Sequence, residues 1–246
     1  MVASNGNDRR NGTRRCGAGT GGRPRDDIGE LTDTMARQGA SEEALVSVSL
    51  STFVGDFAAA LYGVDALRPV AVNQRSGVAF QAGIGPHSEA NTVRLVVERM
   101  AEASPAAYGK HALSVPYPQG RRSCDICLGT APDWAWAIEV KLLRLLGDNG
   151  KPNDNILMHI LSPYPEHRSA LTDCTKLLSS PLGRRKAIVI LGYDYDDWPM
   201  EPAIEAFEAL AAAKAKLGLR LSAPFSGLVH PVHERGAVFG WELLAT

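Results

Sequence analysis

The sequence predicts one α/β domain behind an amino-terminal tail, on three observations. The chain has 246 residues, enough for one sizeable hydrophobic core. Helical stretches with an apolar stripe alternate with short apolar, β-branched segments, which is the order of an α/β protein. The first 38 residues are rich in Gly, Asn, Arg and Asp and lack apolar periodicity. We therefore expect a disordered basic tail over 1–38 and the domain over 39–246. A second interpretation places the true first residue at Met35.

The composition is that of a water-soluble globular protein. Apolar residues make up 45% and charged residues 22% of the chain, and the formal net charge is −1. No apolar run approaches the roughly 20 residues that span a bilayer, and the amino terminus lacks the features of a secretory signal. These observations predict a cytoplasmic protein without a membrane partner. The near-zero net charge neither indicates nor excludes a nucleic-acid partner, because a basic groove can lie on a neutral protein.

The amino-terminal half of the domain predicts two helices. Ser41 is the expected N-cap of the first, which keeps an apolar stripe as far as Leu61 and ends at Gly63. An alternation over 46–50 also permits a strand at its start. Ser88 is the expected N-cap of the second helix, over 89–102, whose apolar stripe consists of Val93, Val96, Val97 and Met100.

The remaining segments complete the α/β order. Asp154 is the expected cap of a short helix over 155–161. Pro202 lies in the first turn of a helix that Gly218 is expected to end. The other predicted elements are strands over 111–119, 121–129, 134–146, 186–196, 219–230 and 236–244, and helices over 167–180 and 202–217.

Two carboxylates and a lysine interrupt the most core-like strands. Asp125 lies in "SCDICLG", and Glu139 and Lys141 lie in "WAWAIEVKLL". Side chains alternate along a strand, so Glu139 and Lys141 share a face. Pairing of the two strands would bring Asp125 beside Glu139, and such close carboxylates repel unless a cation lies between them. Oxygen ligands favour Mg²⁺, with Lys141 able to orient a water or to contact a phosphate.

The Asp on one strand, followed by Glu-x-Lys on the next and by a helix and strand, resembles the PD-(D/E)XK nuclease superfamily. The resemblance covers a core over 86–192, with a helix and strands over 200–246 as additions. It implies a restriction-endonuclease-like core: a central mixed sheet of four to five strands, flanked by helices. It implies Asp125 and Glu139 as ligands of Mg²⁺ (or Mn²⁺) and Lys141 as the catalytic lysine.

The same resemblance implies a Glu on the first core helix that completes the metal site. Glu89 and Glu98 compete for this role. Glu89 shares the apolar stripe of its helix, whereas Glu98 has Arg94 and Glu102 as helical neighbours, the pattern of a solvated face. Glu89 is therefore the predicted catalytic and metal-binding residue.

The implied function is Mg²⁺-dependent hydrolysis of DNA, in restriction, repair or defence. A homodimer or a partner protein could supply targeting. Two alternatives stay open: a non-catalytic nucleic-acid-binding or assembly module with the same fold, and an unrelated α/β domain with a surface Glu139–Lys141 ion pair.

Other candidate residues have simpler interpretations. Cys124 and Cys127 have zinc-knuckle spacing without a second pair, and on a strand they would point to opposite faces as ordinary buried cysteines. His159 is expected in the core, and His230 and His233 at a turn or solvated edge.

Overall fold

The computed structural model describes residues 48–118 and 120–244. The tail predicted over 1–38, the alternative start at Met35 and the helix cap predicted at Ser41 lie outside the described residues.

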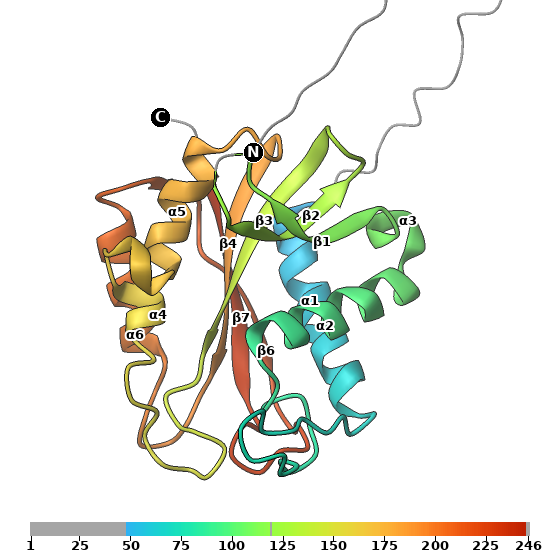
Figure 1. The fold of residues 1–246 in the computed structure, drawn as a ribbon, viewed down its shortest axis with the longest axis vertical. Helices are drawn as coiled ribbons and strands as arrows, with labels where there is room; N and C mark the ends of the chain where they lie inside the picture. The colour runs from blue at the N-terminus through green and yellow to red at the C-terminus, as the bar shows by residue number, and fades with distance from the viewer. Residues whose placement is uncertain (1–47, 119, 245–246) are drawn as a thin grey trace, which may run out of the picture. The chain divides into compact units, whose positions relative to one another are not determined.

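The described residues form an α/β fold around one open, mixed sheet (Figure 1). The strand order is β1-β2-β3-β4-β7-β5, and β6 pairs with β7 as well. Only β3 and β4 pair in parallel; the other neighbours are antiparallel. The strands are β1 (His111–Pro116), β2 (Ser123–Gly129), β3 (Trp134–Leu143), β4 (Arg185–Tyr193), β5 (Lys216–Leu217), β6 (Leu221–Phe225) and β7 (Gly236–Leu244).

Helices cover both faces of the sheet, as Figure 1 shows. One hydrophobic cluster packs α1, α2 and α3 against Trp136, Ile138, Val140 and Leu142 of β3. The other packs α4, α5 and α6 against Ala137 and Leu143, which point the opposite way. The helices are α1 (Leu50–Asp65), α2 (Glu89–Ala103), α3 (Pro105–Tyr108), α4 (Met158–Leu161), the 3₁₀ turn η1 (Pro165–His167), α5 (Ala170–Ser179) and α6 (Glu201–Ala211).

The predicted α/β class is therefore confirmed, but the sheet has seven strands rather than four to five. The excess lies at the carboxyl-terminal end of the chain. Both β5 and β6 pair with one edge of the long strand β7, β5 through Leu217 and Leu243 and β6 through Leu221 and Gly240.

Several predicted helix boundaries are wrong. Helix α1 continues past Gly63 to Asp65, and Ser49 caps its start by accepting a hydrogen bond from the backbone N–H of Thr52. Helix α4 begins only at Met158, so Asp154 does not cap it. Helix α6 ends at Ala211 instead of 217, because the following residues enter β5. Helix α2, by contrast, starts at Glu89 after the Ser88 cap, as predicted.

Among residues 48–118 and 120–244, no helix is both long enough and apolar enough to cross a membrane. The cytoplasmic location stays a prediction.

Candidate functional site at the open edge of β3

The site lies where β2 and β3 separate. The two strands pair as far as Ile126 and Ile138, and β3 then continues to Leu143 alongside β4 only. The unpaired edge of β3 presents backbone N–H groups that need acceptors. Two carboxylates supply them: Asp125 Oδ2 accepts from Val140 N at 2.8 Å, and Glu89 Oε2 accepts from Leu142 N at 3.0 Å. This edge therefore fixes both acidic side chains at the fork.

Glu139 lies on the face of β3 that packs toward α5, and it is 1% exposed. Its Oε1 accepts a hydrogen bond from the Tyr117 hydroxyl at 2.5 Å. The same oxygen lies 2.8 Å from Lys176 Nζ. The carboxylate is therefore buried, but both of its partners are donors, as a buried charge requires.

Lys141 projects on the same side of β3 and joins three elements. Its Nζ lies 3.2 Å from Glu89 Oε1 and 3.0 Å from Asp173 Oδ2, and it donates to the Val140 carbonyl at 3.1 Å. Asp173, on α5, also holds Lys176, whose Nζ lies 2.7 Å from Asp173 Oδ1. Asp173 thus bridges the two lysines.

The electrostatics of the cluster reflect burial and crowding. Desolvation raises the pKa of Glu139 well above its ordinary value, and the nearby Asp125 and Asp173 raise it further. Desolvation also raises the pKa of Glu89, against the effect of Lys141. Burial disfavours the charge on Lys141, but Glu89 and Asp173 outweigh it and raise its pKa. Lys141 is therefore a firmly charged amine in this arrangement.

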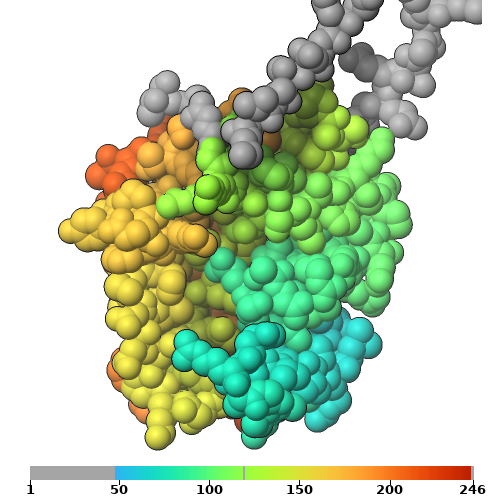
Figure 2. Space-filling view, in the orientation of Figure 1, coloured from blue at the N-terminus to red at the C-terminus, as the bar shows by residue number. Residues whose placement is uncertain are grey.

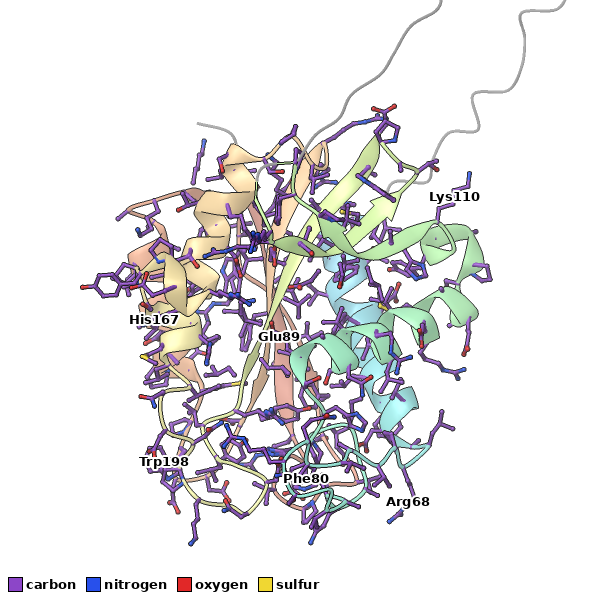
Figure 3. The ribbon with its side chains drawn as sticks, viewed as in Figure 1. Arg68, Phe80, Glu89, Lys110, His167 and Trp198 are labelled. Carbon is purple, nitrogen blue, oxygen red and sulfur yellow. The ribbon has the colours of Figure 1, made fainter. Side chains whose placement is uncertain are left out.

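These residues line a cleft of about 530 Å³, on the side of the molecule where the surface in Figure 2 is hollowed between α2 and the α4–α5 region. In Figure 3, Glu89 lies near the middle of the view at the start of α2, and His167 lies across from it on the α5 side. The cleft is also lined by basic or ionisable nitrogen-bearing side chains, namely Arg121, Arg122, His159, His167 and Arg168.

The structure brings together all four residues predicted for the site: Asp125, Glu139, Lys141 and Glu89. Glu98 lies away from it, exposed and paired with Arg94 at 2.8 Å. Their roles as ligands and catalyst stay predictions.

Sequence reasoning missed three members of the cluster: Tyr117, Asp173 and Lys176. A signal for Asp173 exists, because it lies in the buried stripe of α5 with Leu171, Cys174 and Leu177. A charged residue in such a stripe needs a partner, and Lys176 follows three residues later, on the same helical face.

Other sequence interpretations need correction. His159 is exposed at the cleft instead of in the core, because the short helix α4 buries Ile160. His230 and His233 lie in a turn, as predicted, in which His233 N–H donates to the His230 carbonyl at 3.1 Å. Their side chains are buried, at 1% and 0% exposure, instead of solvated.

The prediction that Cys124 and Cys127 point to opposite faces is also wrong. Both are fully buried in the cluster around α5. A hydrogen bond with Cys127 is the first cause of the raised pKa of Cys124. Cys124 and Ile126 lie two residues apart on β2 but belong to different hydrophobic clusters, so the regular alternation is interrupted between them. The two cysteines are ordinary buried residues in the reduced state, as expected.

The donor set fits a hard divalent cation. Its four carboxylates and two amines leave an excess of two negative charges when all six groups are ionised. Oxygen donors of this type suit Mg²⁺ or Mn²⁺. In the part of the chain that the structure describes, no three His, Cys, Asp or Glu side chains already stand as a ligand group. Lys141 contacts Glu89 Oε1 and Lys176 contacts Glu139 Oε1, so a cation at either oxygen would displace a lysine.

Comparisons with family models, with curated proteins and with solved structures find no significant match to this chain.

Proposed function

We propose that this protein is a Mg²⁺-dependent nuclease of restriction-endonuclease-like architecture that hydrolyses phosphodiester bonds in DNA. One observation carries the proposal: Asp125, Glu139, Lys141 and Glu89 line the same cleft at the fork of β2 and β3. They come from three elements, and Glu89 lies 52 residues before Lys141, so a chance charge pair on one strand does not account for them.

Asp125, Glu139 and Glu89 are the residues that would hold the metal. One carboxylate oxygen of Asp125 and one of Glu89 each accept a hydrogen bond from a backbone N–H of β3. That bond fixes the carboxylate and leaves the second oxygen of Asp125 for the cation. The second oxygen of Glu89 lies 3.2 Å from Lys141 Nζ, so a cation would take it from the lysine. When bound, Mg²⁺ supplies positive charge that polarises a phosphate and favours ionisation of a water.

Lys141 would position the attacking water and offset negative charge that develops on the phosphate. Its ammonium lies between Glu89 and Asp173, and the contact with Asp173 can hold it in place when Glu89 binds the cation. Fixed charge of this kind stabilises a transition state without reorganisation. A firmly charged lysine acts here through its positive charge and N–H groups instead of as a base.

The rim of the cleft suits a phosphate backbone. Arg121, Arg122 and Arg168 line it together with two histidines. Cationic side chains beside a polyanion supply most of the sequence-independent affinity for DNA. One exposed carboxylate, Glu166, shares this lining, and the basic side chains outnumber it there.

The test is a cleavage assay with supercoiled plasmid and branched DNA in Mg²⁺ or Mn²⁺, with EDTA as the blank. Lys141→Ala is expected to lower cleavage by at least about a hundredfold, the scale for removing a preorganised charge from an active site. DNA binding by this variant should change little. The matched control is Lys151→Ala, an exposed lysine outside this cleft, which should cleave at the wild-type rate. Metal-dependent cleavage that survives Lys141→Ala would contradict the proposed role.

A second candidate function is a non-catalytic nucleic-acid-binding module of the same architecture. The closed ion-pair network favours it, since Lys141 and Lys176 already neutralise part of the acidic cluster. DNA binding without cleavage in either metal would select this function.

A further inference from the structure

Lys176 occupies the position where the predicted ligand Glu139 would meet a cation. Its Nζ lies 2.8 Å from Glu139 Oε1, and that oxygen also accepts the Tyr117 hydrogen bond. The ammonium lies 4.9 Å from the centre of the Tyr117 ring, so the aromatic face supports it as well. Glu139 Oε1 thus already contacts two donors, and a divalent ion that binds this oxygen would displace one of them.

A second carboxylate, that of Asp173, can keep Lys176 in an ion pair when a cation binds Glu139. Asp173 Oδ1 lies 2.7 Å from Lys176 Nζ, three residues earlier on the same helix. Lys176 can therefore release Glu139 by a small side-chain rotation without losing an ion pair. Its side chain is 18% exposed, whereas those of Glu139 and Asp173 are 2% exposed, so the lysine is the member of the group with room to move.

Asp173 can also hold Lys141 once the other carboxylates bind a cation. Its buried Oδ2 lies 3.0 Å from Lys141 Nζ but accepts no well-directed hydrogen bond among the described residues. This oxygen has capacity for a better-directed contact with Lys141 when Glu89 turns toward a cation. Asp173 would then hold both lysines while the other carboxylates serve as ligands.

We infer that α5 supplies an internal counter-cation to this site. Lys176 pairs with the Glu139 carboxylate until a divalent ion displaces it, and Asp173 is the positioning residue that then keeps the displaced lysine in an ion pair. This inference rests on the proposed function. It adds that metal binding is a cation exchange, and that the lysines keep the site partly neutralised at low divalent concentration.

Isothermal titration calorimetry of the full chain with Mn²⁺ tests the exchange without reference to activity. Lys176→Met removes the competing charge and is expected to tighten Mn²⁺ binding by about tenfold. Lys176→Gln is a second variant, to be used if the methionine form does not fold by circular dichroism, and the same direction is expected. Lys176→Arg keeps the charge and should stay within about twofold of wild type.

The matched control is Lys110→Met, which changes the net charge equally. Lys110 is exposed and lies well away from Glu89 in Figure 3, so its replacement should leave the Mn²⁺ affinity unchanged. If Lys176→Met binds Mn²⁺ no more tightly than wild type, the inference is overturned while the proposed nuclease function is unaffected. Absence of saturable Mn²⁺ binding in every variant overturns both.

Discussion

At the scale of single residues, the buried Glu139 carboxylate lowers the free energy of unfolding at neutral pH. Its carboxylate is buried beside Asp125 and Asp173, and burial with these two charges raises its pKa well above the ordinary value. A raised carboxyl pKa in the folded state means that the folded protein holds the proton more tightly than the unfolded chain. The contribution to stability is therefore fully present below the ordinary pKa of about 4.5 and is lost as the pH rises through the raised pKa.

The first prediction follows from that sign. In EDTA, Glu139→Gln should be more stable than wild type at about pH 8, by roughly 1 kcal/mol, as is common when functional-site strain is relieved. The glutamine can still accept the Tyr117 hydrogen bond. Urea unfolding followed by tryptophan fluorescence measures the difference, which should shrink toward about pH 4.5. Glu98→Gln, at an exposed site, should show no such trend. A Glu139→Gln protein less stable than wild type at pH 8 would contradict this account.

At the scale of elements, β3 is a strand with a half-open edge. Asp125 and Glu89 act there as side-chain substitutes for the missing neighbour strand, because each accepts from a β3 backbone N–H. The same carboxylates are the predicted metal ligands. Stability and function therefore require different properties of one side chain: the first needs an acceptor, the second a negative charge.

A pair of Asp125 variants separates these requirements. Asp125→Asn keeps a side-chain acceptor for Val140 N, so we expect stability within about 0.5 kcal/mol of wild type but loss of metal-dependent cleavage. Asp125→Ala leaves the N–H without its acceptor and should cost roughly 1–2 kcal/mol of unfolding free energy as well as cleavage. Chemical denaturation and the plasmid assay measure the two effects. Equal stability of the two variants would show that the hydrogen bond to Val140 carries no weight.

The elements also show how far the sequence leads. Helix α2, its Ser88 cap and the strands β2 to β4 follow local patterns of capping and apolar content, and they were predicted within a few residues. Helix α6 was predicted too long because β5 depends on pairing between Leu217 and Leu243, which no local pattern contains. The site shows the same division. Asp125, Glu139 and Lys141 follow from spacing on strands, whereas Asp173 and Lys176 enter only through the packing of α5 on β3.

At the scale of the whole described fold, a second buried polar cluster connects the end of α1, the segment before α2 and the loops after β3 and before β7. Asp65, at the end of α1, accepts hydrogen bonds from the backbone N–H groups of Ile84 and Val229. The rings of His230 and His233 stack with centroids 4.9 Å apart. His233 hydrogen-bonds Asp148 at 3.0 Å.

The same region reaches the start of α2. Arg144, just after β3, donates to the carbonyl of Gly85, three residues before the Ser88 cap. Arg144 Nη1 also lies 3.8 Å from Oδ1 of Asp148, the partner of His233, so the histidine cluster is connected to the segment that presents Glu89 to β3.

This cluster gives the fold an acid limit that is separate from Glu139. Desolvation lowers the pKa of His230, and the neighbouring His233 lowers it further, although Asp148 and Asp65 oppose the shift. Desolvation likewise lowers the pKa of His233, with Asp148 opposing it and Arg144 adding to it. The unfolded chain therefore takes up these protons first, and stability should fall as the pH drops below about 6.5.

His230→Gln tests the acid limit against the opposite effect of Glu139. Each proton that only the unfolded chain binds costs up to about 1.4 kcal/mol per pH unit, so wild type should lose on that order between about pH 6.5 and 5.5. His230→Gln removes one of the two titrating rings of the stacked pair, and its loss over the same range should be clearly smaller. The exposed His159→Gln should follow wild type. Urea unfolding at each pH gives the three profiles, and subtracting the wild-type profile cancels the common contribution of Glu139. Parallel profiles for wild type and His230→Gln would mean that the buried pair does not set the acid limit. A flatter His230→Gln profile would assign the acid sensitivity to the cluster behind α2.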